Sequence, residues 1–278
     1  NVNTTTVFED MRTQNSLLGT KDFVDASSDI YKQNGHGATV LSVMAGNQPG
    51  RYIGTAPLAS YWLIRTEDVS SEFPVEVDNM VAGIEFADSV GVDIITASLG
   101  YFQFDNISMN YSVAQLDGKT VRASIAAEKA AEKGILMICS AGNEGNKDWQ
   151  KITFPADADD ILTVGAINWE KGRVAFSSVG PSADGRIKPT VCAIGESTAV
   201  IRPDDTAGVS SGTSFAAPII AGLSACLWQA LPNYSNREII DLIIRNSDNY
   251  TQPDNYIGYG IPNFYGAYLE GIGAAKAP

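Results

Sequence analysis

Short runs of β-branched and other apolar residues alternate along the chain with segments in which apolar residues recur every three or four positions. The first pattern is typical of buried strands and the second of amphipathic helices. Strands are predicted at residues 21–24, 60–65, 92–99, 135–139, 161–167, 173–176 and 189–194. Helices are predicted at residues 37–44, 74–89, 119–133 and 236–245, and a longer apolar one begins near Ser214 and runs to Leu231.

This alternation predicts the fold class. Strand–helix–strand order implies a central, mostly parallel sheet with helices on both faces, a three-layer α/β sandwich. The chain shows no internal repeat, low-complexity tract or linker, so we expect residues 1–278 to form one domain. In such sheets, functional sites form beyond the carboxyl ends of the strands.

Composition narrows the range of partners. The 278 residues are 44% hydrophobic and 18% charged, with a formal net charge of −13. This charge argues against a nucleic acid or an anionic membrane as partner. No apolar run reaches the length of a membrane span. The three cysteines, Cys139, Cys192 and Cys226, lie in apolar segments and are expected to be buried free thiols.

Three candidate functional residues lie in or next to loops of small residues. His36, the single histidine, lies between glycines just before an apolar helix, and Asn143 follows a predicted strand in Ser140–Asn143. Ser214 lies in the first turn of the long apolar helix, where the helix dipole favours developing negative charge. Taken singly, each has an ordinary structural explanation: a capping or surface histidine, a turn-forming asparagine and an N-cap serine.

Together these segments are specific. The chain resembles the subtilisin-like serine peptidases (subtilases) in the order and content of its motifs, from about Lys21 to about Phe264. The histidine motif departs mildly from the family at Ala38, where threonine is usual. The matching motifs are Asn34-Gly-His-Gly-Ala-Thr-Val40, Ala97-Ser-Leu-Gly100, Ser140-Ala-Gly-Asn143 and Gly212-Thr-Ser-Phe-Ala-Ala-Pro218.

The resemblance implies a serine endopeptidase that acts through an acyl-enzyme. Ser214 would be the nucleophile and His36 its general base, while Asn143 and the Ser214 N–H would hold the oxyanion. The segment Ser98, Leu99 and Gly100 would pair with extended substrate, and Ser140, Ala141 and Gly142 would form a pocket wall. Small residues there predict room for a large side chain. The partner is a peptide or protein, and the chemistry requires no cofactor.

The family's third catalytic residue, an aspartate that orients the histidine, has no match here. The aspartates before His36 are Asp10, Asp22, Asp25 and Asp29, and none follows an apolar strand and precedes a glycine. We therefore expect the first strand and its aspartate upstream of residue 1, supplied by a retained N-terminal fragment or a preceding segment. Burial of such a strand is worth on the order of 10 kcal/mol, comparable with the stability of a whole domain.

Two other functions stay open. The absent aspartate favours a catalytically dead subtilase fold that binds peptides, since replacing a triad aspartate costs about 10⁴ in turnover. A nucleotide-binding α/β protein is disfavoured, because no glycine-rich phosphate motif follows a strand. The resemblance also implies structural calcium; Asp157, Asp159 and Asp160 form an acidic cluster, for which a solvated turn is favoured. An extracytoplasmic or secreted bacterial setting is expected.

Overall fold

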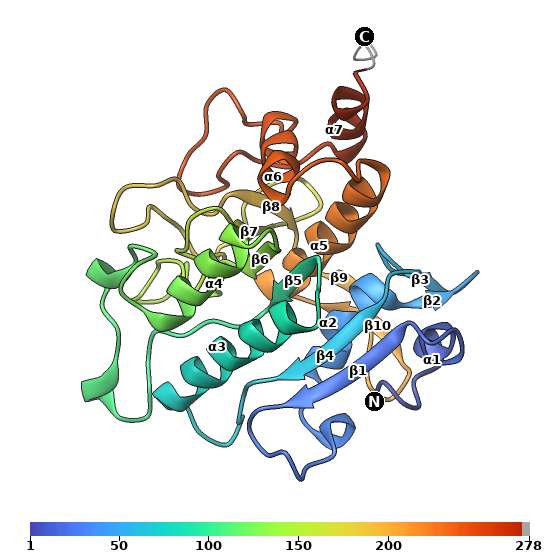
Figure 1. Ribbon diagram of the computed structural model, residues 1–278. Coiled ribbons are helices and arrows are strands. Elements are labelled where there is room, and N and C mark those ends of the chain that lie inside the picture. The colour runs from blue at the N-terminus through green and yellow to red at the C-terminus, as the bar shows by residue number, and fades with distance from the viewer. Residues whose placement is uncertain (274–278) are drawn as a thin grey trace.

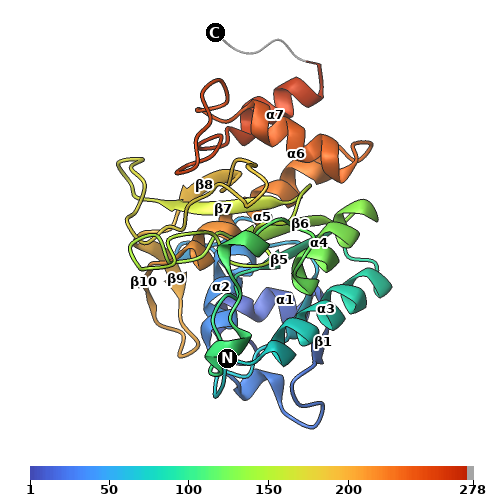
Figure 2. The ribbon, with the colours of Figure 1, turned by 90° about the vertical axis from the view of Figure 1, so that its left-hand side faces the viewer.

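The protein, described here from a computed structural model over residues 1–273, is built in three layers (Figures 1 and 2). Four parallel strands form the main sheet in the order β5, β6, β7, β8. Helices α3 and α4 cover one face, and α2, α5 and α6 lie on the other. The strands are β5 (Ile94–Ala97), β6 (Leu136–Ser140), β7 (Leu162–Ile167) and β8 (Val191–Ile194). The helices are α2 (His36–Ala45), α3 (Pro74–Ser89), α4 (Arg122–Glu132), α5 (Thr213–Ala230) and α6 (Asn236–Arg245).

A second sheet stands beside the first. Strands β1 (Leu17–Asp22) and β4 (Tyr61–Arg65) pair in parallel, with Thr20 opposite Leu63. Two antiparallel hairpins lie at the periphery, β2 with β3 and β9 with β10. The hairpin strands are β2 (Asn47–Gln48), β3 (Tyr52–Ile53), β9 (Thr198–Ile201) and β10 (Ala207–Ser210). The other elements are α1 (Glu9–Thr13), α7 (Phe264–Gly271) and four 3₁₀ turns, η1 (Thr6–Phe8), η2 (Ile30–Lys32), η3 (Ile107–Met109) and η4 (Val113–Gln115).

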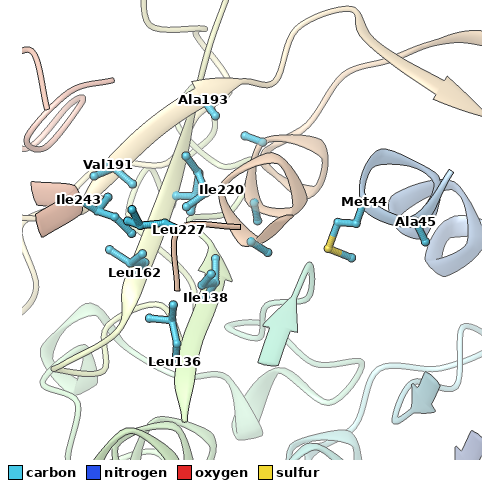
Figure 3. Packing of buried hydrophobic residues seen from close by; sticks show 14 of the residues in the cluster. Met44, Ala45, Leu136, Ile138, Leu162, Val191, Ala193, Ile220, Leu227 and Ile243 are labelled. Atoms are coloured by element: carbon cyan, nitrogen blue, oxygen red, sulfur yellow. The ribbon is translucent and has the colours of Figure 1, made fainter. Parts of the chain in front are cut away.

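The core has two halves, one on each face of the main sheet. Along β6, Leu136 and Ile138 pack into the half beneath α5, while Met137 and Cys139 pack into the half beneath α4. This alternation follows from the two-residue period of a strand. Figure 3 shows the α5 half, where Ile220 and Leu227 of α5 meet residues from β6, β7 and β8. The predicted three-layer sandwich is therefore confirmed.

Helices α2 and α5 pack side by side on one face of the sheet. Helix α5 has 18 residues and a mean hydropathy of 1.2, which is long and apolar enough to cross a membrane. The sequence pattern had suggested no run of that length. The helix is largely enclosed by protein, with 61% of it buried, so we interpret it as the core helix of the sandwich.

Three expectations need correction. Residues 173–176 form one bridge, Arg173 with Ile167, and then turn, because the N–H of Ser177 donates to the carbonyl of Val174. The first strand begins earlier than predicted, at Leu17, and ends at Asp22. Cys139 and Cys192 are buried free thiols as expected, but Cys226 is exposed.

The two parallel sheets are separated by a cavity. Within residues 1–273, strand β4 pairs only with β1 and β5 only with β6, so one edge of each faces the gap. The cavity measures about 1660 Å³ and is lined by apolar side chains from the helices on both sides. We call it the slot; its lining includes Val40 and Met44 of α2, Met80 and Ile84 of α3, and Ala221 and Cys226 of α5. Strands β6 and β7 are fully buried, whereas β4 is half-buried along its whole length.

An ion pair holds the carboxyl end of the two-stranded sheet. The Asp22 carboxylate accepts hydrogen bonds from Arg65 Nη1 at 3.0 Å and from the Ser28 hydroxyl at 2.6 Å. Burial alone would raise the pKa of Asp22, but these donors and the N–H groups of Val24 and Asp25 lower it to about 2. Both side chains of the pair are largely buried, at 7% and 16% exposure.

We expect the substitution Asp22→Asn to destabilise the fold by about 2 kcal/mol at neutral pH, because it removes a charged acceptor from buried donors. A carboxylate whose pKa is depressed by folding contributes stability above its unfolded pKa and loses it as the pH falls through the folded value. The difference in denaturation midpoint between wild type and variant should thus shrink from about pH 4 to about pH 2. Asp241→Asn, at an exposed carboxylate without a side-chain partner in residues 1–273, is the control; equal effects would contradict the ion pair's role.

Candidate active site

The structure places two of the predicted residues at the first turns of adjacent helices. His36 is the first residue of α2 and Ser214 the second residue of α5. Asn34 Oδ1 accepts a hydrogen bond from the His36 backbone N–H at 2.8 Å, which closes the turn before α2. Before α5, Gly212 has a φ of +152°, a conformation that residues with a Cβ rarely adopt. Asn34 thus helps to set where α2 begins, and Gly212 where α5 begins.

The His36 ring lines the slot at the end near Ser98, because its ring partner Phe215 follows Ser214, whose carbonyl accepts from the Ser98 hydroxyl; we call this end the mouth of the slot. It packs edge-to-face against the ring of Phe215, the neighbour of Ser214, with 6.0 Å between centroids and 68° between planes. The ring has solvent access, yet protein surrounds much of it, and this burial lowers the pKa of His36. Within residues 1–273 the ring makes no hydrogen bond. A neutral imidazole is the form that can accept a proton.

The Ser214 hydroxyl is held loosely. Ser214 is 8% exposed, and its Oγ lies 3.5 Å from the carbonyl oxygen of Ser98, at the limit of a hydrogen bond. The Ser98 hydroxyl donates in turn to the carbonyl of Ser214 at 2.8 Å. The backbone N–H of Ser214 lies in the first turn of α5, where no intrahelical acceptor is available.

Asn143 is oriented by the residue before the serine. Its Oδ1 accepts from the Thr213 N–H at 2.9 Å and from the Thr213 hydroxyl at 3.0 Å. A backbone N–H can only donate, so the amide oxygen, not the nitrogen, must face Thr213. The Asn143 NH₂ group makes no hydrogen bond to any residue that the structure describes, and it remains available as a donor beside the start of α5.

The two predicted substrate-binding segments leave adjacent strands at the same edge. Ala97 of β5 is in register with Cys139 of β6, so Ser98–Gly100 and Ser140–Gly142 run on side by side. In the described part of the chain, the N–H and C=O groups of Leu99 and Gly100 pair with no other backbone group. Free backbone groups of this kind can accept an extended peptide as an added strand.

None of the four aspartates before His36 reaches its ring. Asp22 is committed to Arg65, and Asp10 accepts from the Asn47 amide at 2.7 Å. Asp25 accepts from Ser27, and Asp29 caps the 3₁₀ turn η2 through the N–H of Tyr31. The residues from 1 to 273 thus bring no carboxylate into contact with the imidazole.

The acidic cluster at residues 157–160 does not fit calcium. Buried Asp157 accepts from Ser124 and from the Gly118 N–H. Asp159 pairs with Arg186, and Asp160 with Arg237. Because each carboxylate has a different protein partner, the three do not form a shared ligand set, and no other group of three metal-ligating side chains occurs in residues 1–273.

Sequence reasoning missed two residues of this region. Thr213 bridges Asn143 and the Gly142 N–H, the latter at 3.2 Å from its Oγ1. Its position directly before Ser214 in the sequence could have identified it. The second is Thr153, which lies between the two predicted substrate-binding segments. It is ten residues beyond Asn143, outside every motif, and only the folded backbone brings it there.

The chain matches a family of known proteins over nearly its whole length. The sequence model of the subtilase family matches residues 4–260. The chain is 30% identical to subtilisin DY of Bacillus licheniformis over 250 residues, which cover 89% of the chain and 82% of that protein. It is 29% identical to subtilisin E of Bacillus subtilis, where the match covers 91% of the chain but only 61% of the relative.

Solved structures show the same fold. The self-cleaved protease domain of PatA superimposes with a TM-score of 0.72 at 22% identity, covering 94% of this chain and 91% of that one. MycP1 with its N-terminal propeptide removed gives a TM-score of 0.70 at 19% identity, covering 94% and 96%. At these identities the likeness establishes the shared architecture.

The single histidine allows a direct test of the site. In the purified 278-residue chain, the ring proton resonances of His36 should titrate with a midpoint below about 6.5, the ordinary value for histidine, because burial disfavours the charged ring. NMR spectra recorded from pH 4 to pH 9 give the midpoint. His36→Gln identifies the signals by removing them, and a midpoint at or above 6.5 would contradict the environment described.

Proposed function

The chain belongs to the subtilase family of serine proteases, and we propose that it cleaves peptide bonds within chains through an acyl-enzyme formed on Ser214. The observation that carries this proposal is the orientation of Asn143. Thr213 holds its amide oxygen, so its NH₂ group and the N–H of Ser214 are two free donors at one helix start. Donors fixed in advance at that point suit the oxyanion of a tetrahedral intermediate.

Each residue has a defined step. His36 takes the proton from the Ser214 hydroxyl as Oγ forms a bond to the carbonyl carbon of the substrate. The two donors stabilise the resulting oxyanion, and the C–N bond breaks as His36 passes the proton to the leaving amine. Water then attacks the acyl-enzyme by the same route, releasing the acid and restoring the hydroxyl. The free backbone of Leu99 and Gly100 holds the substrate extended.

Replacing Asn143 should separate catalysis from binding. Asn143→Ala is expected to lower kcat by about 10²–10³, the cost of removing one oxyanion donor in subtilisin, a relative, with little change in KM. Steady-state hydrolysis of a chromogenic peptide measures both. Asn146→Ala, at an exposed asparagine of the same loop without side-chain hydrogen bonds in residues 1–273, is the control. Equal kcat for the two variants would argue against the oxyanion role.

The imidazole needs a carboxylate, and we propose that it comes with a strand in the slot. The slot has the features of a missing central strand: two parallel edges, β4 and β5, face it unpaired, and apolar residues line it above and below. A strand of five or six residues spans about 17–20 Å and would pair with both edges. Parallel to them, its carboxyl end would emerge near His36 at the mouth of the slot.

The position of Asn1 supports a proposal for the occupant. Its amino group donates to the carbonyl of Pro203 at 2.7 Å, and a Cβ placed on Gly35 would lie only 2.6 Å from Cγ of the same proline. Asn1 and His36 both line the slot. The start of the described chain therefore lies at the mouth where the strand would end. We propose that the strand is a segment preceding Asn1, continuous or retained after cleavage, with an aspartate or glutamate at its carboxyl end facing His36.

The reactivity of the Cys226 thiol can show whether the slot is filled. Cys226 is the exposed cysteine and lines the slot, while Cys139 and Cys192 are buried. When residues 1–278 are expressed alone, iodoacetamide should modify Cys226, and peptide hydrolysis should be about 10⁴-fold slower than with the segment present. Co-expression with the residues encoded before Asn1 should protect Cys226 and restore hydrolysis. Mass spectrometry of the denatured sample detects both the alkylation and any retained fragment.

Two outcomes would decide against this arrangement. Full activity of residues 1–278 alone, with no second polypeptide and with Cys226 accessible, would refute the strand proposal; Cys226→Ser controls for modification elsewhere. The competing function is a peptide-binding pseudoenzyme, favoured by the absence of a carboxylate on the imidazole in residues 1–273. Failure of a fluorophosphonate to label Ser214 when the slot is filled would support that function instead.

A further inference from the structure

The floor between the two substrate-binding segments is formed by Thr153. Its N–H donates to the carbonyl of Ala141 at 3.1 Å, which ties it to one segment. Its neighbour Phe154 exchanges two backbone hydrogen bonds with Tyr101, which ties the same stretch to the other segment. Thr153 thus belongs to a stretch of backbone that is hydrogen-bonded to both Ser98–Gly100, through the adjacent Tyr101, and Ser140–Gly142.

The side chain of Thr153 fills the space between two glycines. A Cβ placed on Gly142 would lie 2.9 Å from Thr153 Cγ2 and 3.0 Å from its Oγ1. A Cβ on Gly100 would collide with the same hydroxyl. These contacts lie at or below the shortest that real Cβ atoms make, so a side chain at either glycine would displace Thr153. The β-branched side chain is also stiff, so it cannot easily rotate aside.

The hydroxyl of Thr153 is enclosed but has no partner. The residue is 3% exposed, and its Oγ1 makes no hydrogen bond within the described chain. A buried hydroxyl without a partner destabilises the fold, so a threonine here is not a neutral choice of filler.

We infer that Thr153 limits the P1 residue, the one whose carbonyl is attacked, to small side chains such as glycine, alanine or serine. This rests on the proposed function, because only a bound peptide places its P1 side chain between these segments. It reverses the expectation from sequence that small wall residues leave room for a large side chain. The walls are indeed small, but a residue from elsewhere in the chain occupies the space they leave.

Matched substrates test this in the protein carrying its preceding segment. Peptides that differ only in alanine or phenylalanine at P1 should show kcat/KM at least about 10-fold higher for alanine, within the range that pocket size alone can give. Thr153→Gly should raise kcat/KM for phenylalanine at least about 10-fold and leave alanine within about 3-fold. Thr153→Val, which keeps the volume and removes the hydroxyl, should retain the wild-type preference. A wild type that prefers phenylalanine, or a Thr153→Gly variant with unchanged preference, overturns the inference.

A binding measurement separates this inference from the proposed function. Acetylated tetrapeptides ending in alanine or phenylalanine, titrated into Ser214→Ala and into Ser214→Ala/Thr153→Gly, report the pocket without catalysis. Tighter binding of the alanine peptide, reversed by Thr153→Gly, supports the inference even if the wild type hydrolyses nothing. Tighter binding of the phenylalanine peptide to Ser214→Ala, or binding of neither peptide, overturns it. Thr153→Ala serves in place of Thr153→Gly if the glycine variant does not fold.

Discussion

Strands in the middle of a parallel sheet must find hydrogen-bond partners on both sides, and this requirement governs the architecture of the protein. Between β4 and β5 it is not met by residues 1–273, and the sheet divides there. Helix α3, which connects the two strands, packs on β4 and on α4, while α5 crosses the strands of the main sheet. The helical layers therefore hold two sheets in place around a gap that they line with apolar side chains.

The slot connects the stability of the sheet with the proposed catalysis, because His36 is among the residues that line it. The His36 ring stands at the end where a strand parallel to β4 and β5 would finish. Without a nearby carboxylate, burial keeps the pKa of His36 low and the ring neutral. A carboxylate at the strand's end would raise that pKa and stabilise the imidazolium formed when Ser214 gives up its proton. Completion of the sheet and completion of the catalytic group would then be one event.

Two threonines, Thr213 and Thr153, hold the backbone segments of the proposed substrate-binding region in place. Thr213 fixes the amide of Asn143 and accepts from the Gly142 N–H, so the start of α5 and the loop after β6 are one hydrogen-bonded unit. Thr153 joins that loop to the segment after β5 and occupies the floor between them. The first residue holds the amide that we propose as an oxyanion donor, and the second lies where we infer that the P1 side chain would bind. Neither takes part in bond making.

The layer order and most elements were predictable from sequence, because local apolar periodicity largely decides helix and strand. Residues 74–89 and 236–245 form helices with the predicted bounds. The resemblance of four motifs to the subtilases led to His36, Ser214 and Asn143, each of which leaves a local signal at a glycine-flanked helix start or strand end. The exposure of Cys226 and the part played by Thr153 left no such signal. They depend on which segments, distant along the chain, become neighbours, and only the packing of helices and strands around the slot decides that.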